Sequence, residues 1–324
     1  MRILVSQNGE KLGPLSGEEL RELVYRGDVK RNGLARVDGE SDWVSVDTLL
    51  TRPQSRPMAA RRPKVVIPLE QLRDPKERKA LACLWLAAIP VWAALGWWIV
   101  LMHGIPLLIV VGIVLISLLG EFWFAAYLHA NAVRVSATQL PELHRAVLSS
   151  CQHLGLEPPE VYVLRQNVWN AFATRFLGRS VVVLLSGAID SILLKGDMEQ
   201  FTWLVGHELG HHRAGHLHFW RKPASLGNWC VWVRLWYERR CELTCDRLAL
   251  YCVGKLQPSQ RALMNATVGA QLAAEVNLIE AMQQWQQHEG EFFVKYRTLY
   301  STHPHLLCRL KHLQMAALEL GIPG

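Results

Sequence analysis

The sequence predicts a multidomain protein with a small α+β N-terminal domain, a two-helix transmembrane hairpin, and a mainly α-helical domain that carries a small β-sheet. Three observations support this division. Of the 324 residues, 50% are hydrophobic and only 19% are charged, which is an apolar balance for a chain of this length. Residues 80–120 contain no Asp, Glu, Lys or Arg. The segments on either side return to the mixed composition of globular domains.

The N-terminal domain is expected to cover residues 1–50, with a strand near Arg2–Ser6 and an amphipathic helix near 16–26. The run LGPLSGEEL, the later RGDV and Trp43 resemble the second family of GYF-type domains. Such modules are often attached to bacterial membrane proteins. The resemblance therefore makes a protein partner a candidate role for this domain.

The net charge of +7 is concentrated beside the apolar stretch. Nine Lys or Arg but only three Asp or Glu lie between Arg52 and Lys79. We expect residues 51–79, rich in Pro and Arg, to form a basic flexible linker. A basic flank of this kind is typical of a membrane topology determinant, and it gives no reason to expect a nucleic-acid partner.

The uncharged stretch is too long for a single membrane span. One straight helix over residues 80–120 would be about 60 Å long, twice the ~30 Å hydrocarbon core. His103-Gly104-Ile105-Pro106 predicts a turn between two transmembrane helices, at about 80–102 and 105–128, within 80–128. Because Met1–Val5 is followed at once by polar residues, insertion is expected to depend on this internal segment.

The basic linker predicts the orientation of the hairpin. By the positive-inside rule, both ends of the hairpin lie in the cytoplasm. The sequence thus predicts a multi-pass protein of a bacterial inner membrane, in contact with the lipid bilayer, whose flanking domains face the cytoplasm. A hairpin buried inside a soluble protein is the alternative.

Residues 204–211 contain an HExxH motif inside an apolar helix that is expected to start near Asp197. His207 and His211, spaced i and i+4, project from one helix face, so both imidazoles can reach one Zn²⁺. Glu208 is then placed as the catalytic base that takes a proton from the attacking water. This spacing predicts one zinc ion per chain.

A third ligand must come from elsewhere in the chain. In the metzincin pattern a third His would stand at Leu217, so an acidic ligand on a second helix is expected instead. Glu242 and Asp246 share one helix face and are the best candidates.

These residues resemble the HtpX and CAAX prenyl protease group, family forty-eight of the metallopeptidases, over roughly residues 130–315. The resemblance rests on HELGH at 207–211, the ExxxD helix from Glu242 to Asp246 with Arg247, STHP at 301–304 with Arg309, and NAFA at 170–173 with the strand 181–185. It implies that residues 130–324 form a gluzincin-type zincin peptidase domain. Glu242 would be the third zinc ligand.

The same resemblance implies roles for further residues. Asp246 would support a ligand histidine, and His303 would stabilise the oxyanion of the tetrahedral intermediate. Asn170, Ala171 and Phe172 would belong to a strand that binds extended substrate through its main chain. Two departures from the family pattern stand out: Cys245 replaces a common Ala, and Arg175 replaces a common Gly, which puts the geometry of the substrate strand in question.

The predicted function is that of a membrane-anchored zinc endopeptidase acting on polypeptide substrates, namely unfolded or membrane-associated proteins, in protein quality control. The rival from another class is a membrane adaptor that recruits partners through its N-terminal domain and keeps a vestigial or structural metal site. An intact Glu208 argues against the adaptor as the sole role. Prenyl-peptide processing is disfavoured, because two spans cannot build a multi-helix membrane chamber.

Three smaller alternatives concern residues near the motif. His212, His216 and His218 could hold a second metal, and Cys241 with Cys245 could bind zinc, although packing roles are favoured for both sets. Residues 226–237 are strongly apolar but contain Arg234, and twelve residues are too few to cross a bilayer as a helix. They are expected to form an interfacial or core segment, with a re-entrant piece as the alternative.

Overall fold

In the computed structural model the chain divides into two compact units, Met1–Arg62 and Pro63–Gly324, which we describe separately. The structure describes residues 3–7, 10–15, 17–30, 32–37, 42–51, 67–168, 170–176, 178–273, 275–288 and 290–323. Residues 52–66, about half of the predicted linker, therefore lie outside the described residues.

The N-terminal unit is a small α+β domain with its own core. Its elements are β1 (Ile3–Gln7), β2 (Glu10–Leu15), α1 (Gly17–Arg26), β3 (Leu34–Val37), β4 (Val44–Ser45) and α2 (Val46–Thr51). The strands form an antiparallel sheet in the order β2-β1-β3-β4. Val5 from the sheet, Leu20 from α1 and Leu49 from α2 are buried together. This domain thus closes a core without the rest of the chain.

The end of the expected linker is structured, in contrast to the prediction. The short helix α3 (Leu69–Leu72) precedes the first apolar helix, and Leu72 is buried. The Asp74 backbone N–H donates to the Thr244 hydroxyl at 2.9 Å. Composition alone indicated a flexible segment, but these contacts with α9 (Val231–Val253) order residues 67–79 against the second unit.

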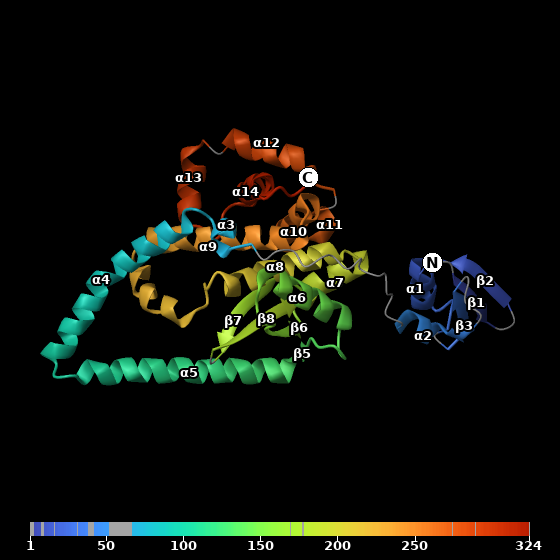
Figure 1. Cartoon of the computed structure of the whole chain (residues 1–324), viewed down its shortest axis with the longest axis horizontal. Helices are drawn as coiled ribbons and strands as arrows, with labels where there is room; N and C mark the ends of the chain where they lie inside the picture. The colour runs from blue at the N-terminus through green and yellow to red at the C-terminus, as the bar shows by residue number, and fades with distance from the viewer. Residues whose placement is uncertain are drawn as a thin grey trace. The chain divides into compact units, whose positions relative to one another are not determined.

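Two apolar helices follow, α4 (Glu77–Leu101) and α5 (Ile105–Asn131), and both are long and apolar enough to cross a membrane. Gly104 adopts a left-handed φ of 84° at the turn between them, a conformation that favours glycine. The helices diverge from this turn (Figure 1). Their apolar side chains are mostly exposed, as expected of helices that face lipid rather than a protein core.

Each apolar helix packs on the rest of the second unit through the part of the helix that is remote from the turn. Leu84 and Ala88 of α4 are buried, and Gly227 of the 3₁₀ segment η2 (Pro223–Trp229) lies so close that a Cβ would stand 2.3 Å from the Leu84 carbonyl oxygen. Leu128, near the end of α5, is buried against the β-sheet of the second unit. The hairpin is therefore built into this unit rather than tethered to it.

The sheet of the second unit contains β5 (Ala132–Arg134), β6 (Glu160–Leu164), β7 (Ala171–Phe176) and β8 (Arg179–Leu185), in the order β5-β6-β8-β7. β6 and β8 are parallel, whereas the other two pairs are antiparallel. β7 lies at one edge and pairs only with β8 among the described strands. Its outer edge is therefore open to an added strand.

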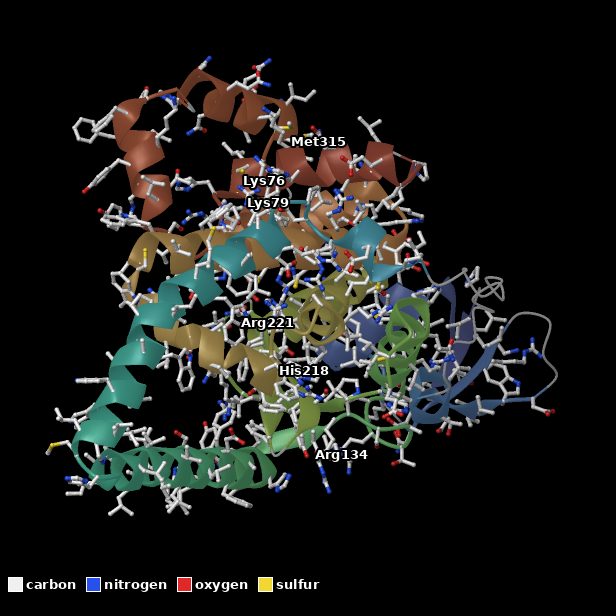
Figure 2. The ribbon with its side chains drawn as sticks, turned by 60° about the vertical axis from the view of Figure 1, so that its left-hand side comes forward. Lys76, Lys79, Arg134, His218, Arg221 and Met315 are labelled. Carbon is white, nitrogen blue, oxygen red and sulfur yellow. The ribbon has the colours of Figure 1, made fainter. Side chains whose placement is uncertain are left out.

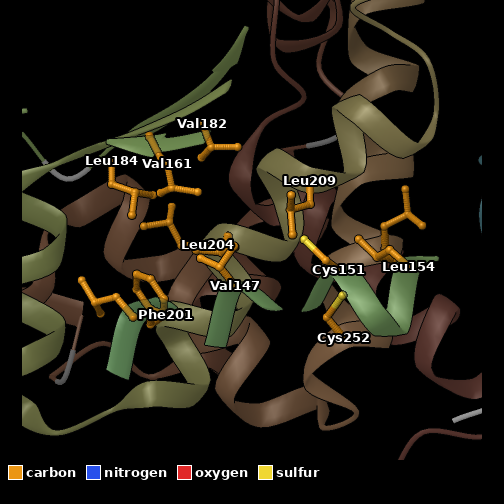
Figure 3. Close-up of a cluster of buried hydrophobic side chains, with 14 of the residues drawn as sticks. Val147, Cys151, Leu154, Val161, Val182, Leu184, Phe201, Leu204, Leu209 and Cys252 are labelled. Atoms are coloured by element: carbon orange, nitrogen blue, oxygen red, sulfur yellow. The ribbon is translucent and has the colours of Figure 1, made fainter. Parts of the chain in front are cut away.

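The remaining elements are mostly helices: α6 (Pro141–Leu154), α7 (Ser186–Lys195), α8 (Met198–Arg213), η1 (Phe219–Arg221), α10 (Leu256–Val268), α11 (Ala270–Ala273), α12 (Leu278–His288), α13 (Phe292–Leu299) and α14 (Leu306–Glu319). The main core joins β8, α6 and α8, where Val182, Val147 and Phe201 are buried together (Figure 3). This core holds α8 against one face of the sheet.

Helices α8 and α9 pack unusually closely because two glycines of α8 face α9. A Cβ at Gly206 would lie 3.1 Å from the Ala249 Cα, and one at Gly210 would lie 3.1 Å from the Cys245 Cα. Cys245 is fully buried at this contact. The close approach brings the face of α8 that carries the HExxH histidines to α9.

Candidate metal centre and active site

Three expected metal ligands converge where α8 meets α9. His207 Nε2 lies 3.4 Å from Glu242 Oε2, and His211 Nε2 lies 3.6 Å from Glu242 Oε1. Ligand atoms about 2.0–2.1 Å from a tetrahedral metal lie about 3.4 Å from one another. Two imidazoles and one carboxylate in this arrangement therefore fit a single zinc ion and leave a fourth position for a substrate or water.

Two neighbouring groups also bring possible ligands together, namely His211, His216 and Cys245, and Glu77, His216 and Cys241. Burial raises the pKa of both thiols, which disfavours the thiolate form that binds a metal. The Glu77 carboxylate already accepts hydrogen bonds from Arg73 and Thr244. The group of His207, His211 and Glu242 is thus the best metal site among the described residues.

His207 is oriented by a buried carboxylate. Its Nδ1 lies 3.1 Å from Asp246 Oδ1, and Asp246 in turn accepts two hydrogen bonds from the Arg309 guanidinium at 2.6 and 2.8 Å. Burial alone would lower the pKa of His207, but hydrogen bonds with Asp246 and Glu242 raise it to about 10. The surroundings of His207 therefore favour positive charge, which a divalent cation also supplies.

His211 has a support of a different kind. Its Nδ1 lies 3.2 Å from His216 Nδ1, and His216 Nε2 lies 3.2 Å from a Glu77 carboxylate oxygen. Burial lowers the pKa of His211 to about 3 and lowers that of His216 as well, so both rings are neutral. If Nε2 of His211 binds a metal, its Nδ1–H donates to His216 Nδ1, and His216 Nε2 lies at ion-pair distance from the Glu77 carboxylate.

Sequence reasoning did not identify His216 and Glu77 as parts of this site. His216 follows the motif in an ordinary histidine-rich stretch, and Glu77 begins the first apolar helix. Nothing in the local spacing pairs them, because they are far apart in the chain and meet only through packing of α4 on α9.

Glu208 projects into the same cavity as the expected ligands and is only 6% exposed. Burial raises the pKa of this carboxyl to about 7; the charge of Glu242 adds to the rise, whereas His207 and a hydrogen bond with the Ala173 backbone oppose it. A carboxyl poised near neutral pH is suited to general base catalysis. The hydrogen bond also links Glu208 to the edge strand β7.

A cavity of about 610 Å³ contains this site and is lined by residues from α8, α9, β7 and the segment before α14. His303, which the sequence predicts to act on the oxyanion, lies on its wall with Nε2 3.7 Å from the Glu242 carboxylate. The His303 side chain is 63% exposed, so it is accessible from solvent. The structure therefore brings it close to the expected ligands.

The expected substrate segment forms another wall of this cavity. Asn170 immediately precedes β7, and its side-chain oxygen accepts the Ala171 N–H at 2.8 Å. Ala171 is buried, and Phe172 packs on Phe124 of α5 with ring centroids 6.2 Å apart. Arg175 pairs regularly with Ser180 of β8, so the replacement of Gly leaves this strand undistorted.

The segment 226–237 forms the end of η2 and the first turns of α9. Trp229 is 63% and Trp232 57% exposed, whereas Leu235 is buried. The segment therefore does not form a membrane-spanning helix of its own; among the described helices only α4 and α5 are both long and apolar enough to cross a membrane.

Comparison with known proteins agrees with this geometry. The family model "Peptidase family M48" matches residues 137–222 and 223–317, together more than half of the chain, and "GYF domain 2" matches residues 4–49. The family match, together with similarity to HtpX homologues, supports a membrane-associated metalloprotease. The chain belongs to peptidase family M48.

Several curated proteins are similar to the chain. "Plastoglobule-localized metallopeptidase 48, chloroplastic" of Arabidopsis thaliana is 24% identical over 56% of this chain and 59% of its own length. "Protease HtpX homolog" of Thermococcus kodakarensis is 25% identical over 59% of this chain and 79% of its own length. "Protease HtpX homolog" of Pyrococcus abyssi is 24% identical over 62% of this chain and 83% of its own length. No solved structure matches the chain.

Proposed function

We propose that the protein is a membrane-anchored zinc endopeptidase of the gluzincin type that hydrolyses peptide bonds of unfolded or membrane-associated proteins. The observation that carries this proposal is the convergence of His207, His211 and Glu242 around one ion-sized position, with Glu208 in the same cavity. The M48 relationship supports the same chemistry.

The described residues can perform each part of peptide hydrolysis. A bound zinc ion supplies Lewis acidity, which polarises the scissile carbonyl and lowers the pKa of water. Glu208 accepts the proton of the attacking water and then delivers it to the leaving amine. His303 donates a hydrogen bond where negative charge develops on the carbonyl oxygen. Asp246 and Arg309 hold His207 in its ligating orientation.

The open edge of β7 supports an endopeptidase that binds extended chains. A polypeptide added as a strand would hydrogen-bond through its main chain, so recognition would tolerate many side chains. Asn170, Ala171 and Phe172 would form the beginning of this binding edge, next to Glu208. Unfolded segments supply such extended chains, which is why we propose a role in protein quality control.

The charges at the ends of the hairpin support a cytoplasmic orientation. Lys76 and Lys79 flank the start of α4, and Arg134 follows α5 (Figure 2). Lys and Arg at both ends, with neither in the turn, favour a cytoplasmic location of the two ends by the positive-inside rule. We therefore propose a multi-pass inner-membrane protein whose N-terminal and peptidase domains are cytoplasmic.

The test uses the full-length protein purified in detergent and an unfolded substrate such as casein. Wild type should bind one zinc ion and cleave casein. Glu208→Gln should lose cleavage by at least about 100-fold and keep its zinc, since a general base contributes about 10²–10⁴-fold. Glu199→Gln, on the exposed first turn of the same helix, is the matched control. Full activity of Glu208→Gln would refute the assigned base.

Recruitment of partners by the N-terminal domain is a second candidate role that accompanies proteolysis. It is supported by the separate core of this unit and by the GYF domain 2 match. Deletion of residues 1–62 should reduce cleavage of native partner proteins and spare small peptides. Equal turnover of native proteins by the truncated and full-length chains would argue against recruitment.

A further inference from the structure

We propose that Arg175 forms a subsite for an acidic side chain of the substrate, at the end of β7 that is remote from Asn170. This inference rests on the proposed function, because it assumes that substrate extends along β7. It names the substrate class more closely: extended polypeptides that carry Asp or Glu a few residues from the scissile bond.

A second cavity continues the catalytic one along the edge strand. It has a volume of about 820 Å³ and is lined by Thr174, Arg175 and Phe176 of β7, by α5, and by residues of the segment 216–225. Ala173 lines the catalytic cavity, and Leu217 lines both. A strand paired with the outer edge of β7 would therefore run from the catalytic cavity into the second one.

The second cavity has a basic lining. Arg175, Arg221 and Lys222 line it, and Glu121 is the sole Asp or Glu among its lining residues. Figure 2 shows Arg221 and His218 close together on the segment after α8. A carboxylate that enters this space therefore meets an excess of positive charge.

Of these three basic side chains, Arg175 is the one that still has a hydrogen-bond donor free to bind a carboxylate. Lys222 pairs with Glu121 at 3.1 Å, and Arg221 donates to the Tyr237 hydroxyl and lies over its ring. No carboxylate of the described residues lies within ion-pair distance of Arg175, and its buried Nε has no hydrogen-bond acceptor there. An unsatisfied buried donor is costly, and a substrate carboxylate would relieve that cost.

The geometry of β7 predicts how far from the scissile bond the acidic side chain of the substrate would bind. Phe172 and Phe176 both pack on Phe124 of α5, so alternation places Arg175 on the opposite face, with Ala173. The Ala173 backbone hydrogen-bonds the Glu208 carboxyl. Arg175 is two residues further, about 7 Å along the strand, so the acid would stand roughly two to four residues from the scissile bond.

An anionic lipid headgroup is the competing ligand, because α5 lines the same cavity. The observations favour a substrate side chain, since Arg175 belongs to the strand that enters the catalytic cavity, and a guanidinium matches a single carboxylate in a bidentate manner. The experiment separates the two possibilities.

The experiment measures kcat/KM of the full-length zinc-loaded protein on quenched fluorescent peptides that carry Asp, Asn or Lys at each position within four residues of the cleaved bond. Wild type should prefer Asp to Asn by about tenfold at one position, as expected for a hydrogen-bonded charge pair. Arg175→Glu should reverse this preference in favour of Lys. Arg179→Glu, whose guanidinium points toward Glu160, is the control and should keep the wild-type preference.

Three results would overturn the inference. The first is equal cleavage of the Asp, Asn and Lys peptides by wild type. The second is an Asp preference that survives in Arg175→Glu. The third is a loss, in Arg175→Glu, of binding to phosphatidylglycerol vesicles without any change in peptide preference, which would assign the subsite to lipid. Failure of the proposed function looks different, because wild type and Glu208→Gln would then cleave every peptide equally poorly.

Discussion

His211 and His216 face each other through their Nδ1 atoms at 3.2 Å, and the far nitrogen of His216 lies 3.2 Å from Glu77, the first residue of the apolar helix α4. The proposed metal ligand His211 is thereby connected, through one histidine, to the apolar helix α4. His207 is supported by Asp246 of α9, outside the two apolar helices. The two imidazoles of the motif thus depend on different regions of the fold.

Loss of this connection should weaken zinc binding. His216→Leu and Glu77→Gln should each lower zinc affinity by roughly 10–100-fold, the usual effect of removing a partner that orients a ligand. Affinity is measured by competition with a chelator, and thermal unfolding in detergent verifies that each variant is folded. Asp74→Asn, in the same buried turn but paired with Arg240, is the control. Unchanged affinity in both variants would show that His216 does not orient His211.

The glycine in the middle of the motif should matter for the distance between the two ligand helices. In Gly210→Ala the new Cβ would stand 3.1 Å from the Cys245 Cα, so α9 must shift and carry Glu242 away from the histidines. We expect destabilisation by roughly 1–3 kcal/mol, typical of overpacking, together with weaker zinc binding. Calorimetry and chelator competition measure the two effects.

Gly112→Ala on α5 is the matched control, because nothing lies within 4 Å of its Cβ position. This control should be neutral or slightly stabilising. A Gly210→Ala protein with the thermal stability and zinc affinity of wild type would contradict the proposed role of close helix packing.

Because of the Asp246–Arg309 pair, the free energy of unfolding should fall at acid pH. Burial would raise the pKa of Asp246, but Arg309 and His207 outweigh it and hold this pKa below its usual range. In the unfolded chain the Asp246 carboxyl has an ordinary pKa of about 3.9, so as the pH falls it binds a proton before the folded chain does. The stabilisation is therefore present above about pH 4 and is lost as the pH falls through the lower pKa of the folded state.

Thermal unfolding of the metal-free protein in detergent at a series of pH values tests this expectation. Wild type should lose melting temperature steeply below about pH 4. Asp246→Asn should be less stable at neutral pH, because the buried Arg309 loses its hydrogen-bonded carboxylate partner, and should show a shallower decline in acid. The exposed Asp190→Asn controls for a general change in charge. Parallel curves for wild type and Asp246→Asn would be inconsistent with the pair.

Features that repeat locally along the chain were predicted well from the sequence. The i, i+4 spacing of His207 and His211 is a property of any α-helix, and the uncharged stretch indicates long apolar helices by length alone. The small N-terminal α+β domain and the M48 relationship are confirmed by the structure and by the comparisons. The roles of Glu242, Asp246 and His303 came from family resemblance and stay predictions.

Contacts between distant segments could not be predicted in this way. Glu77 meets His216 only through the packing of α4 on α9, and Leu72 is buried in the main core. Residues 67–79 were therefore expected to be flexible linker on composition alone. The second cavity along β7 likewise depends on how α5 crosses the end of the strand, which no local pattern specifies.

Anomalous diffraction at the zinc absorption edge, from crystals of the zinc-loaded full-length protein, tests the central claim most directly. We predict one zinc peak about 2.0–2.2 Å from His207 Nε2, His211 Nε2 and a Glu242 carboxylate oxygen. A zinc ion held instead by His216 with Cys241 or Cys245, or a Glu242 side chain that remains outside bonding distance of the ion, would contradict the account.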